Sequence, residues 1–401
     1  MLELAEAQKR ILAAIQPLPN EFISLENAWN RILGENLISP IDLPPFDNSA
    51  VDGYAVQSRD LLAARSINPA LLQLAGKIPA GESFSKALAP GECVRIFTGS
   101  PLPPGADSVA MQEDTSFLPE TPDQIQFSEA TKPWENIRFR GEDVKAGSTL
   151  AEAGIRLTPG MLSLIGAAGI QNFPSARQPK LGILATGSEL RQAGQSLAPG
   201  EIYESNRLTL DALARRIGII PKIYSLIPDT LSETKTALRI AFSECDVVVT
   251  TGGISVGELD FVKAAFQELG GELDFWKVSI KPGKPFAFGR LGPQFLFGLP
   301  GNPVSAFVTF IVLVAPALAK MQGASNFSWP SHPGILSQGL ENRGERRHFI
   351  RVLVDAAGNI RSAGTQASHI LSSLAKANGL VEIPPETVIE KGATVSVLRF
   401  D

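Results

Sequence analysis

Short runs of β-branched and aliphatic residues alternate with longer runs of helical periodicity between residues 176 and 327. Strand-like runs occupy residues 180–187 and 221–227, and they are followed by helical runs at 206–218 and 231–244. In these helical runs apolar residues recur every three or four positions, as in an amphipathic helix with one buried face. The alternation predicts an α/β multidomain fold whose central domain is a doubly wound, mostly parallel sheet.

The flanking segments have a different texture. Short alternating runs separated by Pro- and Gly-rich turns predict a small β-domain, and a helical run at 157–170 is expected to pack back on the N-terminal region. Short strands return after Ser328 and predict a C-terminal β-domain. The predicted domains are an elongated N-terminal domain (1–45 plus 144–175), an inserted β-domain (46–143), the α/β domain (176–327) and the C-terminal β-domain (328–401).

Two apolar segments invite comparison with targeting or membrane sequences. Residues 1–19 are acidic early and interrupted by charge, so they predict an amphipathic helix that ends before Pro17 rather than a signal peptide. Residues 304–319 are shorter than the roughly 20 residues that a membrane span needs, and they contain Ser305 and Pro316. We therefore predict a buried helix there and no membrane partner.

Composition narrows the function classes. The 401-residue chain carries a formal charge of −5, and no segment concentrates Lys and Arg without nearby acids, which argues against a nucleic-acid partner. Two cysteines and three histidines are widely scattered and lack the spacing of zinc or iron–sulfur ligands. A metal, if one is used, is therefore expected to be bound by oxygen. The lack of a disulfide framework suits a reducing cytoplasm.

A strand, a glycine loop and a helical pattern follow one another between residues 246 and 266. Gly252 and Gly253 open this loop and predict free backbone N–H groups that could hold an oxyanion. Glu258 and Asp260 occupy the same helix entrance, where carboxylates would repel a phosphate. Either Asp260 is only a helix cap, or a cation lies between the acids and the ligand.

Lysines gather in the segment at residues 276–285. In an extended strand Lys277, Ser279 and Lys281 would point to one face, because side chains alternate with a period of two. Lysines on a strand can also serve to discourage edge-to-edge aggregation. The segment alone does not decide between an anion site and this protective role.

Acidic residues follow the ends of separate predicted strands, at the sheet edge where α/β domains bind ligands. They are Glu189, Asp229, Glu258 and Asp260. One such acid alone would be explained as a helix cap, whereas several beside lysines favour Mg²⁺ bridging to a phosphorylated ligand. The motifs G-x-x-x-x-G-K-[ST] and G-x-G-x-x-G are absent from the sequence, which disfavours a plain NTPase and a dinucleotide-binding fold.

Longer motifs then point to a family. They are "PPFDNSAVDGYAV", "RIFTGSPLPPGAD", "TGSEL", "TTGGISVGELDF", "KPGKPFAFG" and "GLPGNPVSAF", in this order. Together they resemble the MoeA family, which includes the E domain of gephyrin, over essentially the whole chain. The resemblance implies a MogA-like α/β domain, a C-terminal β-barrel-like domain and molybdopterin molybdenumtransferase activity. In that reaction molybdate is inserted into adenylylated molybdopterin, and AMP is released in a Mg²⁺-dependent step.

The resemblance also implies roles for individual residues. Expected catalytic residues are Asp52, Asp143, Glu189, Asp229 and Asp260, of which the last three are the expected metal ligands. Expected substrate-binding residues are Thr98, Arg138, Gly252, Gly253, Ser255, Lys277, Lys281, Pro300, Pro303, Ser305, Arg351 and Ser372. Several have simpler explanations when taken singly, such as a DG turn at Asp52, an exposed strand charge at Arg351 and a helical serine at Ser372.

The resemblance further implies a homodimer whose cleft combines the inserted β-domain of one chain with the later domains of its partner. The molybdopterin adenylyltransferase is an expected protein partner. Two other functions stay open, namely adenylylation of molybdopterin and a gephyrin-like scaffold. The sequence does not distinguish molybdenum from tungsten, nor does it say which carboxylate holds Mg²⁺ and which positions the attacking oxygen.

Overall fold

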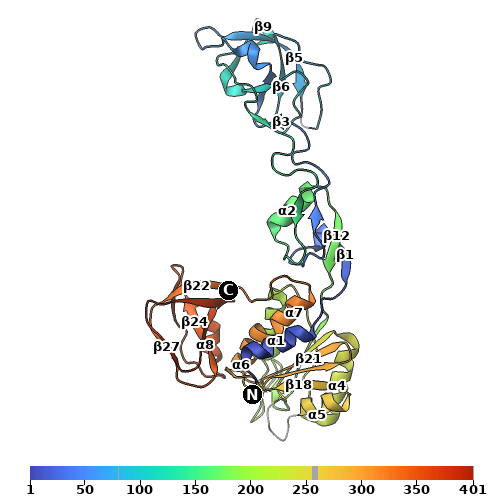
Figure 1. The fold of residues 1–401 in the computed structure, drawn as a ribbon, viewed down its shortest axis with the longest axis vertical. Helices are drawn as coiled ribbons and strands as arrows, with labels where there is room; N and C mark the ends of the chain where they lie inside the picture. Colours follow the sequence, from blue (N-terminus) through green and yellow to red (C-terminus); the bar gives the residue numbers. More distant parts are fainter. Residues whose placement is uncertain (80, 255–260, 401) are drawn as a thin grey trace. The chain divides into compact units, whose positions relative to one another are not determined.

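The computed structural model describes residues 1–79, 81–254 and 261–400. The chain divides into two compact units, which are considered separately (Figure 1). Unit 1 comprises Met1–Glu35, Ala153–Thr158 and Pro174–Asp401, and unit 2 comprises Asn36–Glu152 and Pro159–Phe173. The four-domain division made from the sequence stays a prediction.

Unit 1 contains the expected α/β sheet. Its strand order is β16-β13-β17-β21-β20-β18. The first four strands are parallel, whereas β20 pairs antiparallel with both β21 and β18. The strands are β13 (Leu181–Ala185), β16 (Lys222–Ile223), β17 (Val247–Thr251), β18 (Glu272–Trp276), β20 (Ala287–Leu291) and β21 (Gln294–Leu299).

The sheet is buried on both faces, which explains its nearly continuous apolar strands. Val247 and Val249 belong to one apolar cluster, and Val248 between them belongs to another, because side chains alternate across a strand. Two sets of helices supply the partners (Figure 1). On the face of Val247 lie α1 (Leu4–Ala14), α3 (Asn206–Arg216), α6 (Pro303–Thr309) and α7 (Ala315–Met321); on the other lie α4 (Leu231–Glu244) and α5 (Phe261–Glu268). The doubly wound prediction is confirmed.

The apolar segment near residue 310 is a core helix. α6 continues through a π-helical turn, η4 (Phe310–Val314), into α7, and this turn lies next to Pro316, which offers no N–H to the helix ladder. The span Pro303–Met321 is apolar and long enough for a membrane, but its most apolar window is 94% buried inside the protein. The predicted buried helix is therefore confirmed.

The predicted lysine-bearing strand is wrong. Strand β18 ends at Trp276, and Lys277 adopts a left-handed backbone with φ 95°. Ser279 is buried, whereas Lys281 is exposed at the end of β19 (Ile280–Lys281). β19 has left the α/β sheet and pairs with β24 (Arg347–Val354) of the C-terminal region. The three side chains therefore do not share one strand face.

The C-terminal region of unit 1 is a closed barrel of five strands. β24, β25, β22, β28 and β26 are neighbours in that order, and pairing of β24 with β26 closes the ring. Alternate residues of β24, such as Ile350 and Val352, lie in the barrel core, while Phe349 packs on the α/β domain. The remaining elements are β22 (Ser331–Leu336), β25 (Asn359–Ser362), α8 (Leu371–Lys376), β26 (Gly379–Ile383), β28 (Thr394–Arg399) and the ribbon β23 (Leu340–Asn342) with β27 (Thr387–Ile389).

Unit 2 is built on a six-stranded sheet with the order β7-β4-β6-β5-β9-β8. Gly53 opens β4 where the strands approach closely, since a Cβ there would lie 1.9 Å from the carbonyl oxygen of Ala110. The strands are β4 (Gly53–Val56), β5 (Ala70–Ile78), β6 (Glu92–Ile96), β7 (Ser108–Met111), β8 (Thr115–Leu118) and β9 (Thr121–Phe127). Unit 2 also contains the short strand pairs β2 (Leu37–Ile38) with β11 (Thr149–Ala151) and β3 (Asn48–Ser49) with β10 (Ile137–Arg138), the 3₁₀ helices η2 (Ser58–Leu61) and η3 (Gln112–Asp114), and the α-helix α2 (Pro159–Ala167).

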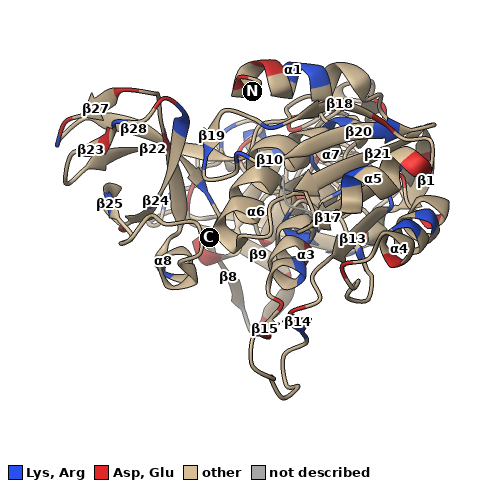
Figure 2. Cartoon of the chain, turned by 90° about the horizontal axis from the view of Figure 1, so that it is seen from below, with Lys and Arg blue, Asp and Glu red and all other residues tan. Residues whose placement is uncertain are grey.

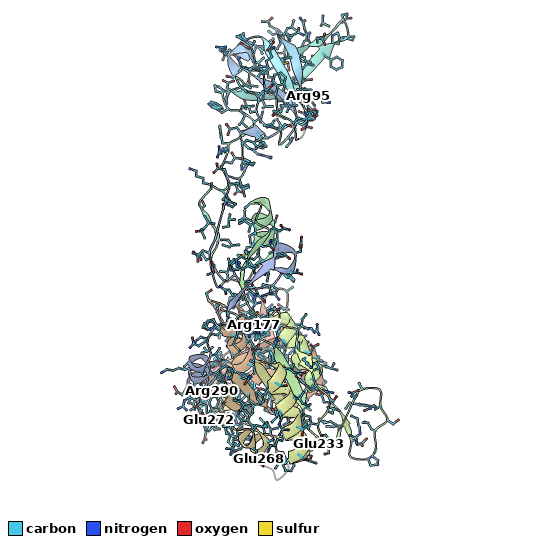
Figure 3. The ribbon with its side chains drawn as sticks, turned by 90° about the vertical axis from the view of Figure 1, so that its right-hand side faces the viewer. Arg95, Arg177, Glu233, Glu268, Glu272 and Arg290 are labelled. Carbon is cyan, nitrogen blue, oxygen red and sulfur yellow. The ribbon has the colours of Figure 1, made fainter. Side chains whose placement is uncertain are left out.

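Charged residues on the outer helices of the α/β domain are mixed in sign. Figure 2 shows Lys and Arg together with Asp and Glu on α4. Lys235 of α4 bonds Glu268 of α5 at 2.6 Å, and Figure 3 labels Glu268. At the start of the sheet, Arg177 binds both carboxylate oxygens of Asp246 at 2.9 Å (Figure 3 labels Arg177). Burial raises the pKa of Asp246, but Arg177 and the N–H of Lys180 together hold this pKa below its usual value.

Candidate active site

The carboxyl ends of the central strands lie level with one another in unit 1. Ala185 of β13 pairs with Thr251 of β17, which in turn pairs with Leu299 of β21. The loops that follow these three residues therefore start side by side. Each loop contains residues that the sequence marked as candidates.

The glycine loop after β17 packs against Thr186. A Cβ at Gly252 would lie 2.5 Å from the Thr186 carbonyl oxygen, and one at Gly253 would lie 2.6 Å from its hydroxyl. Both glycines also have positive φ, 84° and 63°. Only glycine meets both demands, so the two predicted positions are fixed by backbone geometry. Ser255 and Asp260 lie outside the described residues.

Asn206, the first residue of α3, connects two of these loops. Its Nδ2 donates to the hydroxyl of Thr251 and to the carbonyl of Gly301, both at 2.7 Å. The Thr251 hydroxyl in turn donates to the Pro300 carbonyl at 2.9 Å. Pro303 follows as the first residue of α6, where a missing N–H is tolerated. Asn206 therefore holds the loop of Pro300 through Thr251 and Gly301. The sequence analysis missed Asn206, although an Asn at a helix start is a recognisable feature.

Glu189 and Asp229 lie on neighbouring loops. Ser188 N donates to Asp229 Oδ2, and Asp229 N donates to the Ser188 hydroxyl, both at 2.9 Å. Glu189 is exposed and Asp229 is half-buried. Across the described residues, no group of three or more acids, histidines or cysteines lies together as a metal site. Two accessible carboxylates nevertheless fit Mg²⁺, which commonly takes one or two carboxylates together with substrate phosphates and water.

Arg351 is buried, so its interpretation as an exposed charge on a strand is wrong. The residue is 1% exposed. Its Nη1 and Nη2 donate to the carbonyl of Ala367 at 3.1 Å, and Nη2 also donates to Thr365 O at 2.8 Å. Burial lowers the pKa of this guanidinium. Arg351 therefore organises the loop at residues 365–367.

That loop is joined to the start of α6. The carbonyl of Ser368 accepts from Val304 N at 3.2 Å, and the Ser368 hydroxyl accepts from Asn302 Nδ2 at 3.2 Å. Ser305, one residue further, is buried in α6. Ser372 is exposed in the first turn of α8, as a helical serine. Arg351 thus reaches the predicted proline loop indirectly.

His348 was missed by the sequence analysis. It is the register partner of Lys281 in the β19–β24 pair and is 6% exposed. Burial, with the positive charges of Lys281, Arg351 and Arg346, lowers the pKa of His348 to about 4. Arg346 itself donates to the carbonyl of Ile280 at 3.0 Å. Several cations therefore surround a neutral imidazole near Lys281.

In unit 2, Asp52 and Thr98 form a direct pair. Oδ1 of Asp52 accepts from both the backbone N–H and the hydroxyl of Thr98 at 2.8 Å. These two bonds, and to a smaller extent the charge of Arg95, lower the pKa of Asp52. The DG turn considered above is wrong, because Gly53 begins strand β4. Asp52 is thus held as a carboxylate.

The other two candidate residues of unit 2, Arg138 and Asp143, lie in and just after strand β10. Arg138 in β10 pairs with Asn48 in β3 and is exposed. Asp143 is also exposed, and its backbone N–H donates to the carbonyl of Leu43 at 3.1 Å. Both side chains are therefore accessible to solvent.

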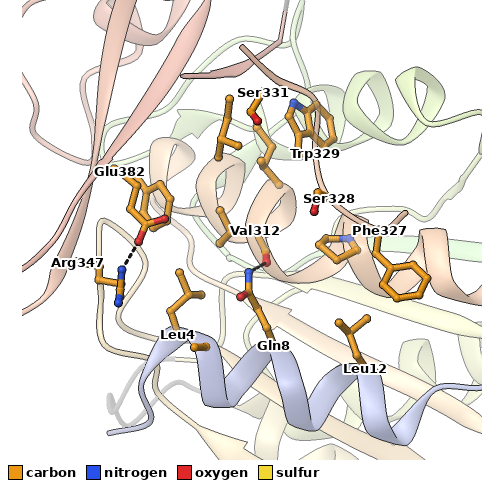
Figure 4. A pocket seen from close by; sticks show the side chains of 15 residues that line it. Leu4, Gln8, Leu12, Val312, Phe327, Ser328, Trp329, Ser331, Arg347 and Glu382 are labelled. Carbon is orange, nitrogen blue, oxygen red and sulfur yellow. Dashed lines mark hydrogen bonds and ion pairs between the residues drawn. The ribbon is translucent and has the colours of Figure 1, made fainter. Parts of the chain in front are cut away.

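A cavity of about 430 Å³ in unit 1 lies elsewhere (Figure 4). Gln8 of α1 donates to the carbonyl of Val312 at 3.0 Å in its wall, and Arg347 binds Glu382 across it. Of the candidate residues that the structure describes, none lines this cavity. Another cavity, of about 420 Å³, is lined by Gly187, Ser188 and Pro228, which are neighbours in sequence of Glu189 and Asp229. The surface is therefore also hollowed at the strand ends, where the candidate chemistry lies.

Models of three protein regions match successive parts of the chain. They are the MoeA N-terminal region (domain I and II) at residues 2–169, a probable molybdopterin binding domain at 182–320, and the MoeA C-terminal region (domain IV) at 333–400. The three matches follow the order expected from the motifs. The relatives described next cover the whole length.

A molybdopterin molybdenumtransferase of Haemophilus influenzae is 41% identical, with 100% of this chain and 99% of the relative covered. Molybdopterin molybdenumtransferase 2 of Mycobacterium tuberculosis is 35% identical, with 100% of each covered. Among solved structures, a molybdopterin biosynthesis moeA protein from Pyrococcus horikoshii is 33% identical, with a TM-score of 0.84 and 100% of each chain covered.

Proposed function

The chain belongs to the MoeA family and is a molybdopterin molybdenumtransferase of molybdenum cofactor biosynthesis, and from this premise we propose how it works. It inserts molybdate into adenylylated molybdopterin and releases AMP in a Mg²⁺-dependent step. The observation that carries this proposal is similarity over the full length of the chain, including the regions before and after the α/β domain. Adenylylation of molybdopterin is less supported, because it would leave these two regions without a role.

Anion binding is the first task of the site. The exposed Lys281 supplies a positive charge for molybdate, and Lys277 together with the N–H group of Gly253 faces the phosphate of the substrate. The expected free N–H of Gly252 is instead engaged, because it donates to the carbonyl of Leu299 at 3.2 Å. Arg351 acts as a positioning residue, since its Nη groups bond carbonyls of the loop that contacts Asn302. Its buried charge also strengthens the positive potential around His348.

Mg²⁺ is the proposed resident ion, and Asp229 and Glu189 would hold it together with Asp260. When bound it supplies Lewis-acid polarisation of the phosphoanhydride. The chain's own contribution is orientation: Ser188 fixes one carboxylate oxygen of Asp229 and leaves the other for the ion. In unit 2 the carboxylate of Asp52, held by Thr98, is available to orient an attacking oxygen.

Two reactions with the purified chain test this function. In one, adenylylated molybdopterin, molybdate and Mg²⁺ are supplied, and AMP and molybdenum cofactor are measured. In the other, molybdopterin and ATP are supplied, and adenylylated product is measured. We expect turnover only in the first reaction. Turnover only in the second would identify an adenylyltransferase, and turnover in neither would favour a scaffold.

The proposal also includes a homodimer in the cytoplasm. The molybdopterin adenylyltransferase supplies its substrate by direct contact. The candidate residues are divided between both units, so Asp52→Asn and Asp229→Asn place lesions in different units. If both variants are inactive but fold normally, activity in their purified mixed dimer would support a site that uses two chains. A mixed dimer without activity would refute shared sites.

A further inference from the structure

A row of side chains crosses the sheet of unit 2 beside Asp52. Arg95 of β6 is the register partner of Tyr54 in β4 and of Lys77 in β5. Register partners project to the same face of a sheet, so the three side chains are neighbours. Figure 3 labels Arg95 in this unit.

Aromatic rings hold the cations of this row in place. The Arg95 guanidinium carbon lies 5.0 Å from the centres of both the Tyr54 ring and the Phe97 ring. Lys77 Nζ lies 5.1 Å from the centre of the Phe97 ring. Such stacking restricts a guanidinium to one plane and leaves the donors at its edge available for an oxyanion.

Hydrogen bonds join the row to the Asp52 loop. Arg95 Nη1 donates to the carbonyl of Gly53 at 3.2 Å, and Nη2 donates to Gln112 Oε1 at 2.5 Å. The backbone N–H of Gln112 donates to the carbonyl of Asp52 at 3.1 Å. Arg95 is therefore fixed relative to Asp52, and through it relative to Thr98.

The acceptors of Arg95 are neutral, so its charge is not compensated by them. Within the described parts of the chain, neither Arg95 nor Lys77 forms an ion pair, whereas Lys86 in the same unit bonds Glu92 at 3.2 Å. Of the nearby carboxylates, Oδ1 of Asp52 is occupied by Thr98, and Glu113 accepts from Gln112. A guanidinium has five N–H groups, of which two have these neutral partners.

We propose that Arg95 and Lys77 form a phosphate-binding subsite on the sheet of unit 2, which holds a phosphate group of the pterin nucleotide beside Asp52 and Thr98. This inference rests on the proposed function. Arg95 supplies the planar fork, and Lys77 supplies a second charge from the adjacent strand. Asp52 then lies next to the bound phosphate, where a held carboxylate can act on an incoming oxygen.

The subsite is tested with Arg95→Gln, Arg95→Lys, Lys77→Gln and, as the matched control, Lys86→Gln. The control removes an exposed lysine of the same unit that is already paired with an acid. We expect Arg95→Gln to weaken binding of adenylylated molybdopterin about 10- to 100-fold and Lys77→Gln about 3- to 10-fold, with the control unchanged. The KM for molybdate should not change in any of them. Arg95→Lys should recover only part of the loss, because lysine lacks the fork.

Binding is measured by equilibrium titration with adenylylated molybdopterin, and folding by thermal unfolding. Affinities of Arg95→Gln and Lys77→Gln equal to that of Lys86→Gln would overturn the subsite. If Arg95→Gln fails to fold, Lys77→Gln decides alone, because its side chain is exposed at the surface. A wild-type chain that binds the nucleotide through Arg95 but never inserts molybdate would refute the proposed function and leave the subsite standing.

Discussion

His348 should make the folded protein sensitive to mild acid. The imidazole is 6% exposed, and its Nε2 has no hydrogen-bond partner among the residues that the structure describes. Burial together with Lys281, Arg351 and Arg346 lowers its pKa to about 4, from an ordinary value of 6.5. Protonation would place a fourth positive charge among three others without an acceptor. The native state therefore requires neutral His348.

The sign and size of the effect follow from this lowered pKa. Because the unfolded chain binds the proton more readily, the stability due to neutral His348 is complete above about pH 6.5 and is lost as the pH falls toward 4. The loss in the free energy of unfolding is about 0.8 kcal/mol at pH 6 and about 2 kcal/mol at pH 5.

The test compares the free energy of unfolding in urea at pH 8, 6 and 5 for the wild type, His348→Gln and His332→Gln. In the His348→Gln variant, the decrease in the free energy of unfolding between pH 8 and pH 5 should be smaller than in the wild type by about 2 kcal/mol. The His332 variant is the control, since that side chain is exposed on β22. A titration of the His348 ring by NMR gives the pKa directly. Equal pH dependence in all three proteins, or a ring that titrates near pH 6.5, would refute the reasoning.

Three further outcomes are expected. Lys281→Ala should raise the KM for molybdate about 10-fold and change pterin affinity less, and the reverse pattern would contradict its assignment to the oxyanion. Asn206→Leu should lower the free energy of unfolding by about 1–3 kcal/mol, because the buried hydroxyl of Thr251 loses the amide donor of Asn206. An unchanged free energy of unfolding in a denaturant titration would contradict this. Thr98→Val should raise the pKa of Asp52, since one of two donors to its carboxylate is lost, and an unchanged carboxyl titration by carbon NMR would count against this.

Local periodicity predicted the regular parts of the fold well. Helix α4 begins and ends where the apolar pattern placed it, at Leu231 and Glu244. The valine run at the opening of the glycine loop is a central strand with opposite faces in different clusters. These elements were predictable because the residues that each of them buries recur at regular spacing within one short segment of the sequence.

The lysine segment was mispredicted because its conformation is decided by distant partners. Ser279 N donates to the carbonyl of Leu2 at 2.7 Å, and Lys277 N donates to that of Phe286 at 2.8 Å. These contacts turn the chain out of one sheet, and Lys281 then joins the barrel strand β24. The prediction assumed that residues 277–281 continue as one strand of one sheet, in which alternate side chains share a face. The bonds to Leu2 and the pairing with β24 prevent this.

The candidate site divides into residues that a motif can reveal and residues that support them. Gly252 and Asp52 stand in recognisable motifs because their backbone or charge is needed at one point of the loop. Asn206 and Arg95 act by bonding two segments that are remote in sequence, such as the loops of Thr251 and Gly301. Because the two bonded segments are far apart in sequence, no short motif reveals such a contact, and only the structure does. A substitution of Asn206 should therefore change substrate affinity or loop stability while every motif quoted from the sequence is still intact, whereas Arg95 is the first residue of one of those motifs.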